Sequence, residues 1–208
     1  QMSFFDHLDE LRSRIIKCIL SVFLFAIITY SQSDRIIDIL IDQVRNQSVN
    51  FQVLKITSIF LIKIGISIIT GIIISFPIII YQALRFILPA FHKLTSKKII
   101  LFTSLSVILF FIGLLFGYEV IIPFSMDFFY RLSIGITYVN LNYTLENYLF
   151  YLIWILIISS MIFQLPFLIV LIVKTGILKV EDFKQYRKHI IVFFFILAAL
   201  LTPPDPIS

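Results

Sequence analysis

The chain has 208 residues with a net charge of +5; 60% of them are hydrophobic, and the mean hydropathy is +1.03. Soluble globular domains are about 45–50% apolar, so this composition excludes an ordinary soluble domain and indicates a membrane protein. The basic residues are scattered singly between apolar stretches, which is not the pattern of a nucleic-acid-binding surface. Cys18 is the one cysteine, so a disulfide framework or a cysteine metal site is excluded.

Residues 1–14 are predicted to form an amphipathic helical arm that leads into the first membrane span. Ser3 and Asp6 fit a helix-capping pattern. Apolar residues recur behind them at helical spacing, at Phe4, Leu8, Leu11 and Ile15. The opposite face of this helix has two adjacent acids, Asp9 and Glu10.

Five apolar segments are each predicted to be a membrane-spanning helix, because a helix satisfies its own backbone hydrogen bonds in lipid. In chain order they cover residues 18–33, 64–84, 99–118, 147–173 and 190–204. The sequence therefore predicts an all-α polytopic bundle that forms a single membrane domain over residues 1–208. No internal repeat is visible, which argues against a two-fold transporter.

The connection at residues 31–55 is too long for a turn. Asp34, Asp38 and Asp42 alternate at helical spacing with apolar residues, so we predict a short helix on the outer surface. Most of the 17 lysines and arginines lie instead in the arm and in the connections at residues 85–98 and 174–189. This asymmetry predicts that the N-terminus and these two connections face the cytoplasm or stroma.

The last segment is short for a span. From Ile190 to Thr202 a helix is about 20 Å long, whereas the hydrocarbon core is about 30 Å thick. Pro203 and Pro204 cannot continue the helix, and Asp205 before Pro206 resembles a cap at the start of a new one. We therefore expect a sixth, returning span beyond Ser208.

Five motifs follow one another along the chain: HLDELR at 7–12, FILPAF at 86–91, FGYEVIIP at 116–123, FQLP at 163–166 and LTPPDPIS at 201–208. Together they resemble the motifs of the TatC family, the polytopic receptor of the twin-arginine protein translocase. The resemblance implies a cupped six-helix membrane protein that binds twin-arginine signal peptides. It also implies an oligomer that assembles with single-span TatA-type and TatB-type partners and exports folded proteins with the proton gradient, without enzyme activity or a cofactor.

The resemblance further implies the residues of a signal-peptide site. Glu10 matches the acid of the family's arm motif, and Phe86 and Pro89 match the phenylalanine and proline of the second cytoplasmic connection. Where the family typically has a glutamate after that proline, this chain has Thr95 amid lysines, which would repel a twin-arginine peptide. We therefore predict that Asp9 takes over as the second acid; looser or partner-assisted recognition is the alternative.

The residues alone leave two interpretations of Glu10. A peptide with two guanidinium groups needs carboxylates that accept paired hydrogen bonds. Glu10 also stands four residues before Arg14, which is the spacing of an intrahelical ion pair. The spacing favours the pair with Arg14, and the resemblance favours the role in signal-peptide binding.

Gln164 is a polar residue deep in the fourth predicted span, two residues before Pro166, which can kink the helix. A polar side chain in lipid must find a partner, and an interhelical hydrogen bond is one solution. The resemblance implies instead that Gln164, Pro166 and Asp205 lie on the concave face and contact a partner or a signal helix. Asp205 is equally well explained as a helix cap.

Other function classes fit less well. An enzyme or metal site is disfavoured because the histidines lie near the ends of spans and the spans contain no acid. A small-molecule transporter and a passive assembly subunit remain the alternatives to a receptor. The preference for Ile and Phe over Ala and Gly suggests an AT-rich genome, which favours a plastid thylakoid membrane or a mitochondrial or bacterial inner membrane.

Overall fold

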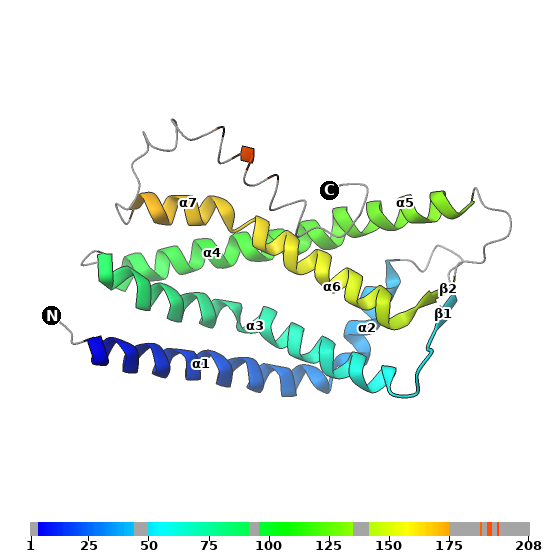
Figure 1. Ribbon diagram of the computed structural model, residues 1–208, viewed down its shortest axis with the longest axis horizontal. Coiled ribbons are helices and arrows are strands. Elements are labelled where there is room, and N and C mark those ends of the chain that lie inside the picture. The colour runs from blue at the N-terminus through cyan, green and yellow to red at the C-terminus, as the bar shows by residue number, and fades with distance from the viewer. Residues whose placement is uncertain are drawn as a thin grey trace. The chain divides into compact units, whose positions relative to one another are not determined.

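The computed structural model describes residues 4–43, 50–91, 96–134 and 142–174, and the isolated residues 188, 191, 192 and 195 (Figure 1). Its helices are α1 (Phe4–Tyr30), α2 (Ser33–Asp42), α3 (Ser58–Phe91), α4 (Ser96–Phe116), the π-helical η1 (Gly117–Ile121), α5 (Ile122–Ile134), α6 (Leu145–Ile162) and α7 (Leu165–Lys174). Two strands of three residues, β1 (Asn50–Gln52) and β2 (Asn142–Thr144), complete the described elements. The predicted helical fold class is confirmed.

Three helical stretches of the described chain are long and apolar enough to cross a membrane: Ser58–Ile87, Lys97–Arg131 and Leu145–Lys174. They contain the second, third and fourth predicted spans. The first predicted span lies mostly within α1, which ends at Tyr30 and is not among these three stretches. The fifth predicted span and Asp205 lie almost entirely outside the described residues.

Two helices continue further than the sequence predicted. We expected a connection from residue 85 onward, but α3 remains helical to Phe91, so Arg85 is a helical residue. We also expected the third span to end at Tyr118, but the chain passes through η1 directly into α5. Pro123 has no N–H to bind the carbonyl of Glu119, four residues earlier, so an α-helix would be interrupted there. The wide π turn accommodates this proline, and the helix continues past Glu119.

The helix of the fourth predicted span is interrupted just before its proline. A turn at Phe163 and Gln164 separates α6 from α7, and Pro166 is the second residue of α7. Since a proline has no N–H and its ring crowds the carbonyl four residues earlier, a helical ladder fails at Ile162, where α6 ends. The predicted kink is therefore present, and it places Gln164 in the turn.

The chain forms two compact units, of which the first comprises residues 1–38 and 57–108. Within it, α1 and α3 pack closely. The Thr29 hydroxyl donates a hydrogen bond of 2.9 Å to the Ser67 carbonyl across this contact. A Cβ atom at Gly71 would lie 2.8 Å from the Ala26 nitrogen, so only glycine allows the two backbones to approach this closely.

The second unit comprises residues 39–56 and 109–208. Within it, the Ser159 hydroxyl of α6 donates a hydrogen bond of 2.7 Å to the Gly113 carbonyl of α4. Strands β1 and β2 pair in parallel, with Asn50 opposite Asn142 (Figure 1). The helix predicted in the connection at residues 31–55 is present as α2, and the hydroxyls of Tyr118 and Tyr148 donate hydrogen bonds to carbonyls in its last turn.

Candidate functional site

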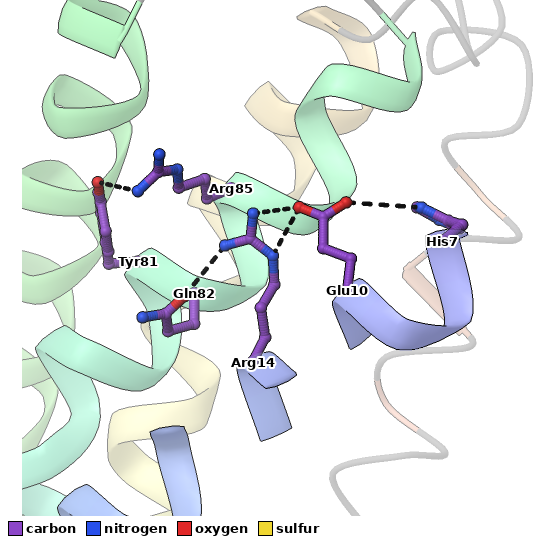
Figure 2. Close-up of polar contacts among 6 residues, drawn as sticks. All are labelled: His7, Glu10, Arg14, Tyr81, Gln82 and Arg85. Atoms are coloured by element: carbon purple, nitrogen blue, oxygen red, sulfur yellow. Dashed lines mark hydrogen bonds and ion pairs between the residues drawn. The ribbon is translucent and has the colours of Figure 1, made fainter. Parts of the chain in front are cut away.

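Polar and aromatic side chains from α1 and α3 meet within the first unit (Figure 2). We call this group the arm cluster, and it consists of His7, Glu10 and Arg14 from α1 with Tyr81, Gln82, Arg85 and Phe86 from α3. The residues of α1 recur every three or four positions, so they share one face of the helix. The close α1–α3 packing described above holds this face against α3.

Arg14 is the centre of the arm cluster. Its Nε donates a hydrogen bond of 3.0 Å to Oε1 of Glu10, and its Nη2 donates a second hydrogen bond to the same oxygen. Its Nη1 donates a third, also 3.0 Å long, to Oε1 of Gln82 on α3 (Figure 2). The Arg14 side chain is only 14% exposed. The guanidinium therefore connects the two helices instead of lying free on the surface.

Glu10 is the acid of the cluster, and its side chain is 31% exposed. The hydrogen bonds from Arg14 lower the pKa of the Glu10 carboxyl, and this effect outweighs the rise that desolvation causes. Glu10 is therefore ionised at neutral pH. Arg14 uses only Oε1, while Oε2 lies 3.9 Å from His7 Nδ1, too far for a hydrogen bond. Among the residues that the structure describes, no donor lies within hydrogen-bonding distance of Oε2.

Aromatic contacts extend the cluster along α3. The imidazole of His7 stacks on the ring of Phe86, with centroids 4.3 Å apart and an interplanar angle of 13°. Arg85 Nη1 donates a hydrogen bond of 3.3 Å to the Tyr81 hydroxyl, and its guanidinium carbon lies 5.9 Å from the centre of that ring. Phe86 is therefore beside the same face of α1 that presents Glu10.

The structure brings together only part of the site that the sequence predicted. Glu10 and Phe86 lie in the arm cluster, and the intrahelical pair of Glu10 with Arg14 is present. Asp9 is exposed on α1. Pro89 lies in α3, but its side chain is outside the described residues, as is Thr95 entirely.

The second predicted group falls in the other unit of the chain. Gln164 is 7% exposed in the turn between α6 and α7, whereas Pro166 is exposed. Within the described ranges, no three or more His, Cys, Asp or Glu side chains are placed to hold a metal ion.

Gln82 and Arg85 are cluster residues that no motif in the sequence indicated. Gln82 is a polar residue near the end of an otherwise apolar predicted span, and such a residue requires a hydrogen-bonding partner. That signal was available, although it did not identify Arg14 as the partner. Arg85 was counted only as a charge that helps to set the membrane orientation.

The arm cluster has side chains of the kind that bind a cation. It offers one ionised carboxylate, one amide and an aromatic surface, and its own arginine already demonstrates how a guanidinium fits there. The model of the family described as Sec-independent protein translocase protein (TatC) matches residues 6–208. This chain belongs to the TatC family.

Relatives in the TatC family align with nearly the whole chain. An uncharacterized tatC-like protein of Reclinomonas americana is 33% identical over 206 residues, covering 97% of this chain and 78% of its own length. The TatC protein of Carboxydothermus hydrogenoformans is 31% identical over 208 residues, covering 100% of this chain and 85% of its own. The family that the five motifs indicated is confirmed.

A solved TatC structure has the same fold. The crystal structure of the twin-arginine translocase receptor TatC in DDM superposes with a TM-score of 0.81 at 28% identity, over 95% of this chain and 88% of the other. This TatC-family chain is therefore a helical membrane component of a Sec-independent protein translocase. A small-molecule transporter is not favoured.

Proposed function

We propose that the chain is the core receptor of a twin-arginine translocase and that it binds the twin-arginine signal peptide of its cargo at the arm cluster. The observation that carries this proposal is the Glu10 carboxylate, which already accepts two hydrogen bonds from the guanidinium of Arg14, and these hydrogen bonds lower its pKa. A site that holds one arginine in this geometry has the chemistry needed to hold another. Membership of the TatC family supports the same role.

Arginine fits this site better than lysine. A guanidinium is planar and presents several N–H donors in a fixed fork, whereas an ammonium is a compact, strongly hydrated point charge. Near a membrane surface, where screening by solvent is weaker, the charge-assisted hydrogen bonds of a guanidinium contribute more than in bulk water. The stacked rings of His7 and Phe86 add an apolar surface beside the carboxylate.

Asp9 is the proposed acceptor for the second arginine of the pair. Neighbouring residues on a helix diverge by about 100°, so Asp9 and Glu10 present their carboxylates in different directions. Adjacent side chains of an extended peptide also diverge. Two divergent acids therefore suit two divergent arginines, and this arrangement compensates for the neutral Thr95. We propose that Pro89 and Thr95 contribute to the shape of the signal-peptide site and not to its charge.

The remaining parts of the proposal concern topology and assembly. The N-terminus and the arm cluster face the cytoplasm or stroma, in a thylakoid membrane or in a bacterial or mitochondrial inner membrane. The partners are single-span proteins of the TatA and TatB type, which contact the surface around Gln164, Pro166 and Asp205. The chain catalyses no reaction itself; the proton gradient supplies the free energy with which folded cargo crosses.

Photocrosslinking in membranes tests the receptor role. A twin-arginine signal peptide with a photoreactive residue beside its arginine pair is incubated with the full-length protein, and the crosslinked residues are mapped by mass spectrometry. A twin-lysine peptide is the control for the ligand. The variants are Glu10→Gln and Asp9→Asn, with Asp38→Asn as the matched loss of an exposed acid on α2, away from the arm cluster.

We expect arginine-dependent crosslinks to residues 7–17 of α1 and 81–86 of α3. Glu10→Gln and Asp9→Asn should reduce them strongly, and Asp38→Asn should not. Equal crosslinking by the twin-lysine peptide, or crosslinks confined to other parts of the chain, would contradict the proposal and would favour a passive assembly subunit.

A further inference from the structure

Arg14 occupies the carboxylate that a signal arginine is proposed to use. Two of its donors bind Glu10 Oε1, and a third binds Gln82 Oε1 on another helix (Figure 2). An ordinary surface pair at this spacing lacks the third contact and exchanges readily with solvent. Arg14, by contrast, is held by two helices and is largely buried.

We propose that Arg14 is an internal competitor that closes the arm cluster and must leave Glu10 before a signal arginine can bind fully. This inference rests on the proposed role of Glu10. In the free protein the cluster is mostly closed, with Arg14 on Glu10. In the bound state the guanidinium of the peptide replaces that of Arg14, which gives up its contacts with both Glu10 and Gln82.

Competition of this kind has a specific thermodynamic signature. When only a fraction of molecules is open, the apparent dissociation constant of every ligand is the intrinsic constant divided by that fraction. Arg14 therefore lowers the affinities of the twin-arginine and twin-lysine peptides by the same factor. At cellular concentrations a peptide with low intrinsic affinity, such as the twin-lysine peptide, then fails to bind, whereas the twin-arginine peptide still binds. The ratio of the two affinities is a property of Glu10 and Asp9, and Arg14 leaves it unchanged.

The charges around the cluster explain why a closed state is useful. Arg85 lies close enough for its charge to act on Glu10. Glu10 would be an exposed acid in a basic region if Arg14 were absent, and any lysine-rich segment could bind it. With Arg14 in place the carboxylate is neutralised and the binding of every cationic segment is weakened alike, so that only a ligand of high intrinsic affinity still binds.

Equilibrium binding to the full-length protein in lipid nanodiscs tests the inference. Fluorescence anisotropy of labelled twin-arginine and twin-lysine peptides gives both dissociation constants for the wild type, Arg14→Gln, Gln82→Leu and Lys17→Gln. Lys17→Gln removes one positive charge from an exposed position of the same helix and controls for long-range electrostatics. Gln82→Leu releases one anchor of Arg14 without any change of charge. Circular dichroism verifies that each variant is folded.

We expect Arg14→Gln to tighten both peptides by a common factor of about three to ten, since it removes one ion pair and one charge-assisted hydrogen bond from the closed state. Gln82→Leu should lower the dissociation constants of both peptides by a smaller common factor. Lys17→Gln should change these dissociation constants by less than Gln82→Leu does. Weaker binding of the twin-arginine peptide to Arg14→Gln would overturn the inference, because Arg14 would then be orienting Glu10 for the ligand. A changed ratio of the two affinities would also overturn it.

The proposed function fails in a different way. If the wild type binds both peptides equally, and Glu10→Gln changes neither, then Glu10 is not the arginine acceptor and the premise is lost. If wild-type binding depends on arginine and on Glu10 but Arg14→Gln does not tighten it, only the competitor role is wrong.

Discussion

Gly113 marks a close approach between α4 and α6, and replacement by alanine tests that packing. A Cβ atom there would lie 2.8 Å from the Cα of Ser160, 2.9 Å from the Cβ of Phe163 and 3.0 Å from the carbonyl oxygen of Ser159. Two of these three atoms belong to the backbone, so the clash cannot be relieved by rotating a side chain. The helices must separate by several tenths of an ångström.

The expected loss of stability follows from three contributions. Overpacking of a close contact costs about 1–3 kcal/mol. Separation of the helices also weakens the hydrogen bond from Ser159 to the Gly113 carbonyl, and interhelical hydrogen bonds in membranes contribute about 0.6 kcal/mol on average. Alanine has a higher helix propensity than glycine, which offsets about 1 kcal/mol of this loss of stability. Gly113→Ala should therefore lower the free energy of unfolding by about 0.6–2.6 kcal/mol.

Unfolding of the purified full-length protein in detergent, with increasing SDS and far-ultraviolet circular dichroism as the readout, measures this change. Gly117→Ala is a matched control one turn further along, where a Cβ atom would lie 3.1 Å from the Cβ of Ser159 and 3.4 Å from Cδ2 of Leu156. These contacts are milder and involve side chains, so its cost should be smaller. If Gly113→Ala were as stable as the wild type, or less damaging than Gly117→Ala, the close α4–α6 packing would be refuted.

Thr29→Val should destabilise the protein by about 0.6–1.7 kcal/mol in the same unfolding assay, because it keeps the side-chain shape but removes the buried hydrogen bond to the Ser67 carbonyl; unchanged stability would contradict this contact. Asp9→Asn should weaken binding of the twin-arginine peptide about tenfold in the nanodisc assay, because the second arginine loses its charged acceptor; undiminished affinity would exclude Asp9 as the second acid. Arg14 lowers the pKa of Glu10, so peptide binding that requires ionised Glu10 should persist above that pKa and disappear as the pH falls through it. In Arg14→Gln the pKa of Glu10 is no longer lowered by Arg14, and binding should therefore be lost at a higher pH than in the wild type. Loss of binding at an unchanged or lower pH would contradict this effect of Arg14.

Local patterns in the sequence predicted the features that depend on neighbouring residues. The four-residue spacing of Glu10 and Arg14 indicated their ion pair, and the alternating acids of residues 34–42 indicated α2. Pro166 indicated the break in the fourth span, because the missing N–H of a proline has a fixed consequence for the preceding turn.

Features that depend on tertiary contact were not predictable in this way. Nothing in the periodicity of α3 associates Gln82 with Arg14, which is 68 positions away in the chain. Strands β1 and β2 have three residues each, too few to show alternation, and they pair although they are far apart in the sequence. The third predicted span ends at residue 118, whereas η1 and α5 continue the helix past this point.

The proposed function requires that this TatC-family chain recognises arginine through Glu10. The most direct measurement is the ratio of the dissociation constants of the twin-lysine and twin-arginine peptides for full-length wild type and for Glu10→Gln in nanodiscs. We expect the twin-arginine peptide to bind the wild type at least about tenfold more tightly, which corresponds to about 1.4 kcal/mol, and Glu10→Gln to bring the ratio close to one. A ratio near one in the wild type, or a preference for arginine that survives in Glu10→Gln, would contradict the account.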